Sequence, residues 1–349
     1  MKQKLYLSYI AGIAAAMLTV SCRQVNIEPE QQTVEASFDA RINGEIPETK
    51  GIPVEDLNSF KTRVELFTIW GFMGNNRINE FFNKDVRIYG SRYYPVTNGE
   101  FEFLNLPAGL TRQNEMFYGL AADRSENTVT VTNVEKAGGV TFNYTAHLPY
   151  TQSTQTYYHR DAEALGEVLA GILVSGGVNE DGIIPLDFYH PLAAVRFRAG
   201  SDITKTITIK EIGINGVMTQ GTCNFYRNAE KNMVMSWTNQ SNSQNYLQSY
   251  DNTLSPSSSL GEEINNSQSS KTWFIIPQTF GAGSSIVIKY DMRGNEHTAT
   301  IPLDGVKFED NHVYWYTLTK GGVVFESRVN TWIEGNSQTN QYVESGIYW

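Results

Sequence analysis

Short runs of aromatic and β-branched residues, separated by turn-forming residues, extend along most of this 349-residue sequence. Residues of these types favour extended strands, and the chain holds 19 Tyr and 17 Phe. The runs follow one another at residues 63–70, 101–103, 115–121, 128–131, 139–142, 186–197, 206–214, 271–276, 285–290, 298–301, 312–319 and 323–333. Many short strands with turns between them, and no alternation of strands with helices, predict an all-β chain built of β-sandwiches.

A glycine-rich break at residues 176–182 divides the sequence into two parts. Such clusters of turn-forming residues separate elements or domains, and the length of the chain allows two cores of ordinary size. We therefore expect an N-terminal β-sandwich over residues 51–180 and a C-terminal β-sandwich over residues 181–349. A signal peptide over residues 1–22 and a tether with a first strand over residues 23–50 would precede them.

Two segments fit the strand pattern less clearly. Residues 162–173 form the best helix candidate, because apolar side chains recur at helical spacing, at Leu165, Val168, Leu169 and Ile172. Their content of Val and Ile also suits a strand, so both alternatives stay open. Residues 237–270 are rich in Asn, Gln and Ser and predict a long polar loop, which in other proteins is usually functional or mobile.

The first 22 residues have the layout of a secretory signal that ends at a cysteine. Lys2 and Lys4 provide a basic start, and a mostly apolar stretch over residues 6–20 leads to Cys22. A cysteine at such a boundary accepts diacylglycerol in bacterial lipoproteins, so we predict lipidation at Cys22. The alternatives are an ordinary signal peptide or a membrane anchor, but a bilayer span needs about 20 apolar residues.

Charge and cysteine content narrow the partners and the source of stability. The net charge is -10 at pH 7, which disfavours nucleic acid because phosphate binding needs clustered Lys and Arg. Cys22 and Cys223 are the two cysteines of the sequence. With Cys22 lipidated, Cys223 has no partner for an internal disulfide, and we expect it to be a small buried hydrophobe.

No motif of the sequence indicates catalysis. The five histidines share no metal-ligand spacing, and the sequence contains no HExxH, no GxSxG, no P-loop and no dinucleotide-binding glycine motif. His190 lies in an apolar run and is interpreted as a core histidine. We therefore expect no enzyme, no metal and no cofactor. Glycoside hydrolases can use two carboxylates that are far apart in the sequence, so the absence of these motifs does not exclude that class of enzyme.

Four phrases in the second half of the sequence resemble those of a known family. They are the apolar run of residues 186–197, Trp-Phe-Ile-Ile-Pro-Gln at 273–278, Asn-His-Val-Tyr-Trp-Tyr-Thr-Leu at 311–318 and Asn-Thr-Trp at 330–332. Together and in this order they resemble the fimbrillin-like (Mfa-like) family, whose members are subunits of type V pili.

The resemblance implies two tandem transthyretin-like β-sandwiches and a precursor that is exported as a lipoprotein to the outer membrane. It also implies a maturation protease that cuts after Arg or Lys and removes the first strand of the N-terminal domain. A strand from the C-terminal end of another pilus subunit then fills the open groove. The expected partners are therefore other pilus subunits, the protease and, through the lipid, the membrane; the expected location is the fimbrium on the cell surface.

The segment that would be removed is recognisable in the sequence. Apolar and polar residues alternate over residues 33–43, the period of a half-buried strand. A loop with Pro47 follows and leads to Lys50 and Gly51, and exposed loops are accessible to proteases. We predict cleavage between Lys50 and Gly51, with Arg41, inside the strand, as the competing site.

The C-terminus ends in an unusually apolar stretch. Residues 342–349 follow a polar linker, and Val343, Ile347 and Trp349 lie on one side of an extended chain. We expect these three residues to be the pocket-filling side chains of a donor strand, with pairing inside the chain's own domain as the alternative. The sequence thus predicts a structural or adhesive pilus subunit. An anchor or tip subunit, or a surface glycan-binding lipoprotein, are the alternatives.

Overall fold

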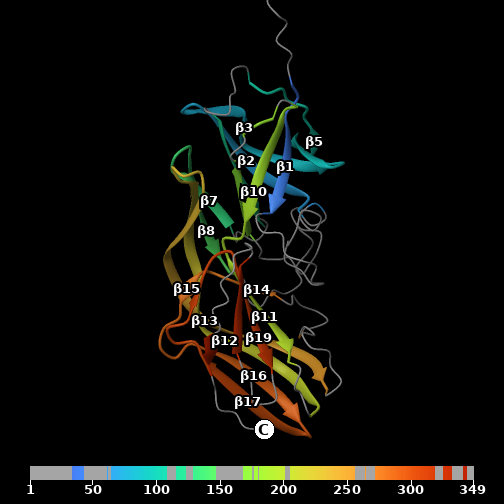
Figure 1. Cartoon of the computed structure of the whole chain (residues 1–349), viewed down its shortest axis with the longest axis vertical. Coiled ribbons are helices and arrows are strands. Elements are labelled where there is room, and N and C mark those ends of the chain that lie inside the picture. The colour runs from blue at the N-terminus through green and yellow to red at the C-terminus, as the bar shows by residue number, and fades with distance from the viewer. Residues whose placement is uncertain are drawn as a thin grey trace, which may run out of the picture. The chain divides into compact units, whose positions relative to one another are not determined.

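The structure is a computed structural model of the chain. It describes residues 34–42, 61, 64–107, 115–122, 129–146, 168–174, 177–179, 181–200, 205–255, 264, 272–318, 325–331 and 341–343. Every element whose bounds are described is a β-strand (Figure 1). The predicted all-β class is therefore confirmed.

The first sheet closes on itself. Its strands, in order across the sheet, are β1 (Ser37–Ile42), β10 (Ile183–Tyr189), β9 (Val168–Leu173), β6 (Glu115–Ala122), β2 (Leu66–Met73), β3 (Asn76–Tyr89), β4 (Arg92–Thr97) and β5 (Glu100–Phe101). Strand β1 also pairs with β4, through Phe38 and Tyr93. In the described chain, the first seven strands of this order, from β1 through β10 and on to β4, therefore form a closed circuit. Asn98 and Gly99, both with positive φ, form the tight turn that joins β4 to β5.

A five-stranded sheet contains β14 (Thr272–Ile275), β11 (Ala193–Ala199), β19 (His312–Leu318), β20 (Phe325–Thr331) and β21 (Gln341–Val343), in this order. A six-stranded sheet contains β17 (Asn295–Pro302), β16 (Ser285–Met292), β12 (Ile207–Arg227), β8 (Gly139–Thr145) and β7 (Val129–Glu135), with β13 (Met233–Leu254) also paired to β12. Strands β15 (Gln278–Thr279) and β18 (Lys307–Phe308) form a small pair.

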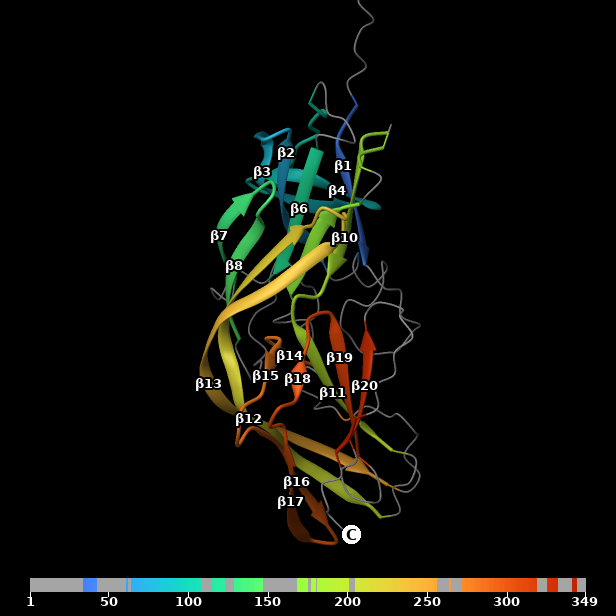
Figure 2. The same cartoon turned by 60° about the vertical axis from the view of Figure 1, so that its left-hand side comes forward.

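The long strand β12 connects two groups of strands. Residues 208–215 pair with β16, residues 220–225 pair with β8, and β13 runs beside β12 along nearly its full length (Figure 2). Three register shifts interrupt the β12–β13 pairing. Such bulges bend a strand and increase its twist, which allows one strand to serve both groups.

The described side chains form two apolar clusters. Strands of the five-stranded sheet lie between them and contribute side chains to both clusters. In β11, Ala194 belongs to the cluster of the closed sheet, whereas Ala193 and Val195 belong to the second cluster. In β19, Trp315 belongs to the first cluster and Tyr316 to the second. Since neighbouring residues of a strand point to opposite faces, both faces of these two strands are buried. The division into domains at residue 180 stays a prediction.

Two sequence expectations are corrected by the structure. Residues 168–173 form strand β9, so the strand alternative is correct for them and the helix is wrong. All six residues are buried, and β9 pairs with β10 on one side and β6 on the other. A strand buried on both faces is continuously apolar and cannot be told from a buried helix by periodicity alone. The first part of that candidate, residues 162–167, lies outside the described residues.

The expected polar loop at residues 237–270 is also wrong over its first half. Strand β13 extends to Leu254 and pairs with β12, although most of its side chains between residues 236 and 249 are exposed. Its polar composition reflects exposure of a long ribbon rather than the absence of a strand. Of the remainder, the structure describes Ser255 and the buried Ile264, whose N–H donates to the Phe197 carbonyl at 2.9 Å.

Candidate functional site

Strand β1 is the element that closes the first sheet. It runs parallel to β10 over six residue pairs, from Ser37 beside Ile183 to Ile42 beside Phe188. Its pairing to β4 rests on one residue pair, Phe38 with Tyr93. Figure 1 shows β1 in blue beside β10. Because nothing else in the described sheet joins β10 to β4, removal of β1 would leave two unpaired strand edges facing each other.

The side chains of β1 alternate as the sequence predicts. Ala36, Phe38 and Ala40 are fully buried, whereas Asp39 is half-buried and Arg41 is exposed. The alternating strand expected over residues 33–43 is therefore confirmed as β1, together with the short extended segment before it. One face of this strand fills the interior. The opposite face is buried at Ser37 and becomes exposed only toward Arg41.

The Phe38 ring is the largest group that β1 inserts into the interior. It contacts the rings of Phe81 and Phe117 edge to face, with centroids 6.0 and 5.9 Å apart. Full burial of a Phe side chain contributes about 1.5–3 kcal/mol, and each favourable aromatic pair adds about 0.5–1.5 kcal/mol. Phe38 therefore dominates the side-chain contribution of β1 to the closed sheet.

A backbone seat holds the segment before β1. The Ala36 N–H donates to the Leu104 carbonyl at 2.7 Å, and the Ser37 N–H donates to the Gly182 carbonyl at 3.1 Å. Gly182 has φ +78°, and a Cβ atom on it would lie 2.2 Å from the Glu35 carbonyl oxygen. Only glycine fits this position without moving the backbone, so Gly182, the last residue of the glycine-rich break, forms part of the seat of β1.

The ion pairs of β1 lie at the solvent-facing side and contribute less. Asp39 lies 3.6 Å from the Lys61 amine and 4.0 Å from Arg41. Exposed pairs of this kind contribute about 0–1 kcal/mol. Arg41 stands opposite Asp187 in the register, and burial raises the pKa of Asp187 while the charges of Arg41 and Arg227 lower it. Backbone pairing and Phe38, rather than charge, hold β1 in place.

Most of the other predicted site residues lie outside the described residues: Cys22, Lys50, Gly51, Ile347 and Trp349. Val343 ends strand β21, which pairs antiparallel with β20, Val343 standing opposite Phe325. Strand β21 is the last strand of its sheet and makes three residue pairs. The described structure therefore brings no two of the predicted cleavage and donor residues together.

The predicted structural residues lie as expected. Cys223 is free and buried, and burial raises its pKa. His190 is buried, and its backbone exchanges hydrogen bonds with Asn311: the Asn311 N–H donates to the His190 carbonyl at 2.7 Å, and the His190 N–H donates to Asn311 Oδ1 at 3.2 Å. His190 is thus a core residue that fixes the loop before β19.

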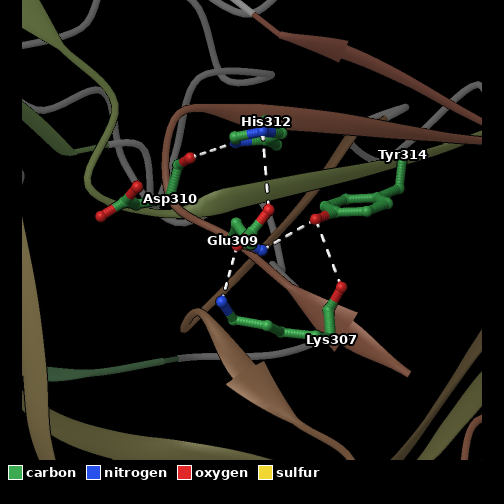
Figure 3. A network of polar contacts seen from close by, with 5 residues as sticks. All are labelled: Lys307, Glu309, Asp310, His312 and Tyr314. Atoms are coloured by element: carbon green, nitrogen blue, oxygen red, sulfur yellow. Dashed lines mark hydrogen bonds and ion pairs between the residues drawn. The ribbon is translucent and has the colours of Figure 1, made fainter. Parts of the chain in front are cut away.

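A polar loop that no sequence motif indicates lies between β18 and β19 (Figure 3). The Lys307 amine donates to Glu309 at 2.6 Å, and the Glu309 N–H donates to the Tyr314 hydroxyl at 2.8 Å. His312 contacts the Asp310 carbonyl through Nδ1 and lies 3.8 Å from Glu309 through Nε2. The hydrogen bond from Lys307 lowers the pKa of Glu309. These contacts fix the course of the loop.

Asp310 is the exception in this loop. Its carboxyl group points away from the other labelled side chains in Figure 3 and has no hydrogen-bond partner among the described residues. Burial raises its pKa to about 6, whereas the charge of His312 acts in the opposite direction. A carboxyl group with a perturbed pKa and free acceptor atoms is a candidate for ligand binding.

In the described part of the chain, no group of three or more His, Cys, Asp and Glu side chains could hold a metal ion. The same residues include no helix that is long and apolar enough to cross a membrane.

Solved structures with a similar fold are candidate cell adhesion proteins of Bacteroides. One from Bacteroides ovatus matches over 89% of this chain and 96% of its own length, with 13% identity and a TM-score of 0.50. One from Bacteroides uniformis matches over 87% of this chain and 99% of its own, with 13% identity and a TM-score of 0.45. A fimbrial protein from Bacteroides ovatus matches over 83% of this chain and 48% of its own, with 11% identity and a TM-score of 0.35.

No protein-family model matches the sequence, and no curated protein matches it. At 11–13% sequence identity, a structural likeness shows a similar fold and nothing more. The second and third matches, with TM-scores of 0.45 and 0.35, carry no further argument. The first match shows that this chain shares its fold with a candidate cell adhesion protein of Bacteroides ovatus.

We predict that Phe38→Ala destabilises the precursor by about 3–5 kcal/mol, the usual range for a buried Phe truncated to Ala. Denaturant unfolding measures the loss, and hydrogen exchange should show it concentrated in residues 37–42. Asp39→Asn is the matched control on the solvent side of the same strand and should change stability by less than about 1 kcal/mol. Equal effects of the two substitutions would show that β1 is not held by its buried face.

We predict that ionisation of Asp310 lowers stability between pH 4 and 6. The folded pKa is about 6 against an ordinary 3.8, so the folded protein holds a proton that the unfolded chain has lost. Stability is therefore highest below pH 4, falls up to pH 6 and stays lower above it. Asp310→Asn should raise the free energy of unfolding at pH 8 by about 1–3 kcal/mol and leave it unchanged at pH 4.

Denaturant unfolding at both pH values measures this effect. Asp304→Asn, at an exposed position before the same loop, serves as the control and should leave the pH dependence of the wild type in place. A pH profile that is identical in wild type and Asp310→Asn would contradict the assignment of the effect to Asp310.

Proposed function

We propose that this chain is a structural or adhesive subunit of a type V pilus, and that it polymerises by exchange of strand β1. The observation that carries the proposal is the position of β1 as the strand that closes the first sheet between β10 and β4. The likeness in fold to a candidate cell adhesion protein of Bacteroides ovatus supports it. In this proposal the chain holds two tandem transthyretin-like β-sandwiches, with a boundary near residue 180.

In the precursor, β1 protects the edges that would otherwise recruit other strands. Six parallel pairs with β10 cover one edge, and the buried Phe38 fills the interior beside Phe81 and Phe117. Unpaired strand edges next to an apolar slot are sites of uncontrolled association. A subunit that keeps β1 during export to the outer membrane, as a lipoprotein attached through Cys22, would therefore stay monomeric.

Cleavage between Lys50 and Gly51 would then release β1 from the mature subunit. The cut separates residues 23–50, with the lipid on Cys22, from the remainder of the chain. Arg41 is less suited to proteolysis, because its backbone is paired with Asp187 in the ladder of β1 and β10, and proteases cut exposed, unpaired segments. Release of β1 leaves a groove that accepts an extended strand through backbone hydrogen bonds and side-chain pockets.

The C-terminal segment is the proposed donor. Among the described residues, strand β21 is the last strand of its sheet and makes three residue pairs with β20, so its detachment would break few of the described pairs. In β1 and the residue before it, buried apolar side chains recur every second residue, at Ala36, Phe38 and Ala40. Val343, Ile347 and Trp349 follow one another at spacings of four and two residues, so all three lie on the same side of an extended chain.

Lys50→Ala should leave a lipidated subunit that retains β1 and does not polymerise, because the exchange groove stays closed. The N-terminal residue of the surface protein and ladders of oligomers on gels measure the two effects. Lys50→Arg, which preserves a basic residue, should be processed normally, and Arg41→Ala should be processed at Lys50. A mature protein that starts at Cys22 and still assembles would indicate an anchor subunit and contradict the proposed processing.

Deletion of residues 342–349 should leave a folded monomer that cannot extend a fibre. Burial of each large apolar side chain in a groove contributes about 1.5–3 kcal/mol, so loss of all three weakens each joint by several powers of ten. Electron microscopy of assembled fibres and denaturant unfolding of the monomer separate assembly from folding. Unfolding of the truncated monomer would show that the segment is an internal strand, and fibres of normal length would place the donor elsewhere.

A further inference from the structure

An open pocket of about 360 Å³ lies between β13, the β15–β18 pair and the polar loop that follows β18. Its lining includes the aromatic Trp237 with Met235, the hydroxyl group of Thr279, the amides of Gln240 and Gln278, and the charged groups of Lys307, Glu309 and Asp310. Its volume falls within the range of about 300–1,000 Å³ that is usual for ligand pockets. None of its lining residues belongs to the seat of β1.

The aromatic wall of the pocket is held in a fixed orientation. The Trp237 indole N–H donates to the Pro191 carbonyl at 2.7 Å. The same indole contacts Phe142 and Tyr144 edge to face, with centroids 5.9 and 6.0 Å away. A side chain fixed by one hydrogen bond and two ring contacts loses little freedom when a ligand binds against it.

The polar groups of the pocket offer both acceptors and donors. The Asp310 carboxyl has no hydrogen-bond partner among the described residues, and Glu309 uses one oxygen for Lys307. The Lys307 ammonium retains further N–H groups beyond that bond. The Thr279 side chain is exposed, and its hydroxyl group can donate and accept. A ligand that matches this lining must itself carry both donors and acceptors.

This mixture disfavours charged ligands. An anion would approach the carboxylates of Glu309 and Asp310, and an organic cation would approach the Lys307 ammonium. Hydroxyl groups, by contrast, donate to carboxylates and accept from ammonium groups. A ring that carries hydroxyl groups on its edge and C–H groups on its face can also pack against an indole.

We propose that this pocket binds one unit of a neutral saccharide, with hydroxyl groups on Asp310 and Lys307 and the apolar face of the sugar against Trp237. The site is separate from the seat of β1, so saccharide binding does not depend on strand exchange. The pocket would give the subunit a direct means of attachment to glycans, in addition to any structural role in a fibre.

Saturation-transfer NMR on the full chain tests this proposal. The probes are methyl glycosides of glucose, galactose, mannose and N-acetylglucosamine, and the disaccharides lactose, maltose and cellobiose. We expect transfer to the ring C–H protons of at least one probe at pH 7.5. Asp310→Asn, which preserves the size of the side chain, should weaken its affinity about tenfold or more, as expected for loss of a charged hydrogen bond.

Trp237→Ala should abolish binding, and Trp237→Tyr, which retains a ring, should restore part of it; circular dichroism verifies that each variant is folded. Asp304→Asn lies outside the pocket lining and should bind as wild type does. Absence of transfer to every neutral probe would overturn the proposal. Wild-type affinity in Asp310→Asn would place the saccharide elsewhere and also overturn it, as would binding of sulfate or methylammonium ions without any sugar.

Discussion

The parallel pairing between β1 and β10 is the constraint on which the closed sheet depends. The two strands are about 145 residues apart in the sequence (residues 37–42 with 183–188), so their pairing requires the closure of a long loop and gains nothing from local structure. Strand β1 completes the circuit through its pairs with both β10 and β4. The other six strands of the circuit are joined to one another by pairs that do not involve β1.

The two apolar clusters limit how far a change at β1 extends. Ala36, Phe38 and Ala40 all belong to the cluster of the closed sheet, and none of the side chains described in β1 belongs to the second cluster. Strands β11 and β19 supply side chains to both clusters from opposite faces. Loss of β1 therefore removes packing from one side of these two strands, while the second cluster keeps all of its described members. Local opening of one region with the other intact is the usual behaviour of such units.

Sequence patterns predicted the strands well where one face of a strand is buried and the other is exposed. They identified β1 because Phe38 and Asp39 lie in different surroundings, and they failed at residues 168–173, where both faces of β9 are buried. They failed again along β13, whose long exposed ribbon has the composition of a loop. Alternation of apolar and polar residues indicates a strand that is buried on one face. The pairing of β1 with β10 is a long-range property that no local pattern contains.

The sequence patterns did not indicate Asp310 as a candidate site residue, because its surroundings are also a long-range property. Its neighbours in sequence include ordinary polar residues, and its raised pKa comes first from burial, which no local sequence motif reports. Folding alone disfavours a half-buried carboxyl group without a hydrogen-bond partner, since its ionisation at neutral pH opposes the folded state. Glu309, one position earlier, has its charge satisfied by Lys307. The difference between these adjacent carboxyl groups indicates that the loop uses one for its own structure and presents the other to the pocket beside Trp237, where binding energy rather than folding energy would compensate its charge.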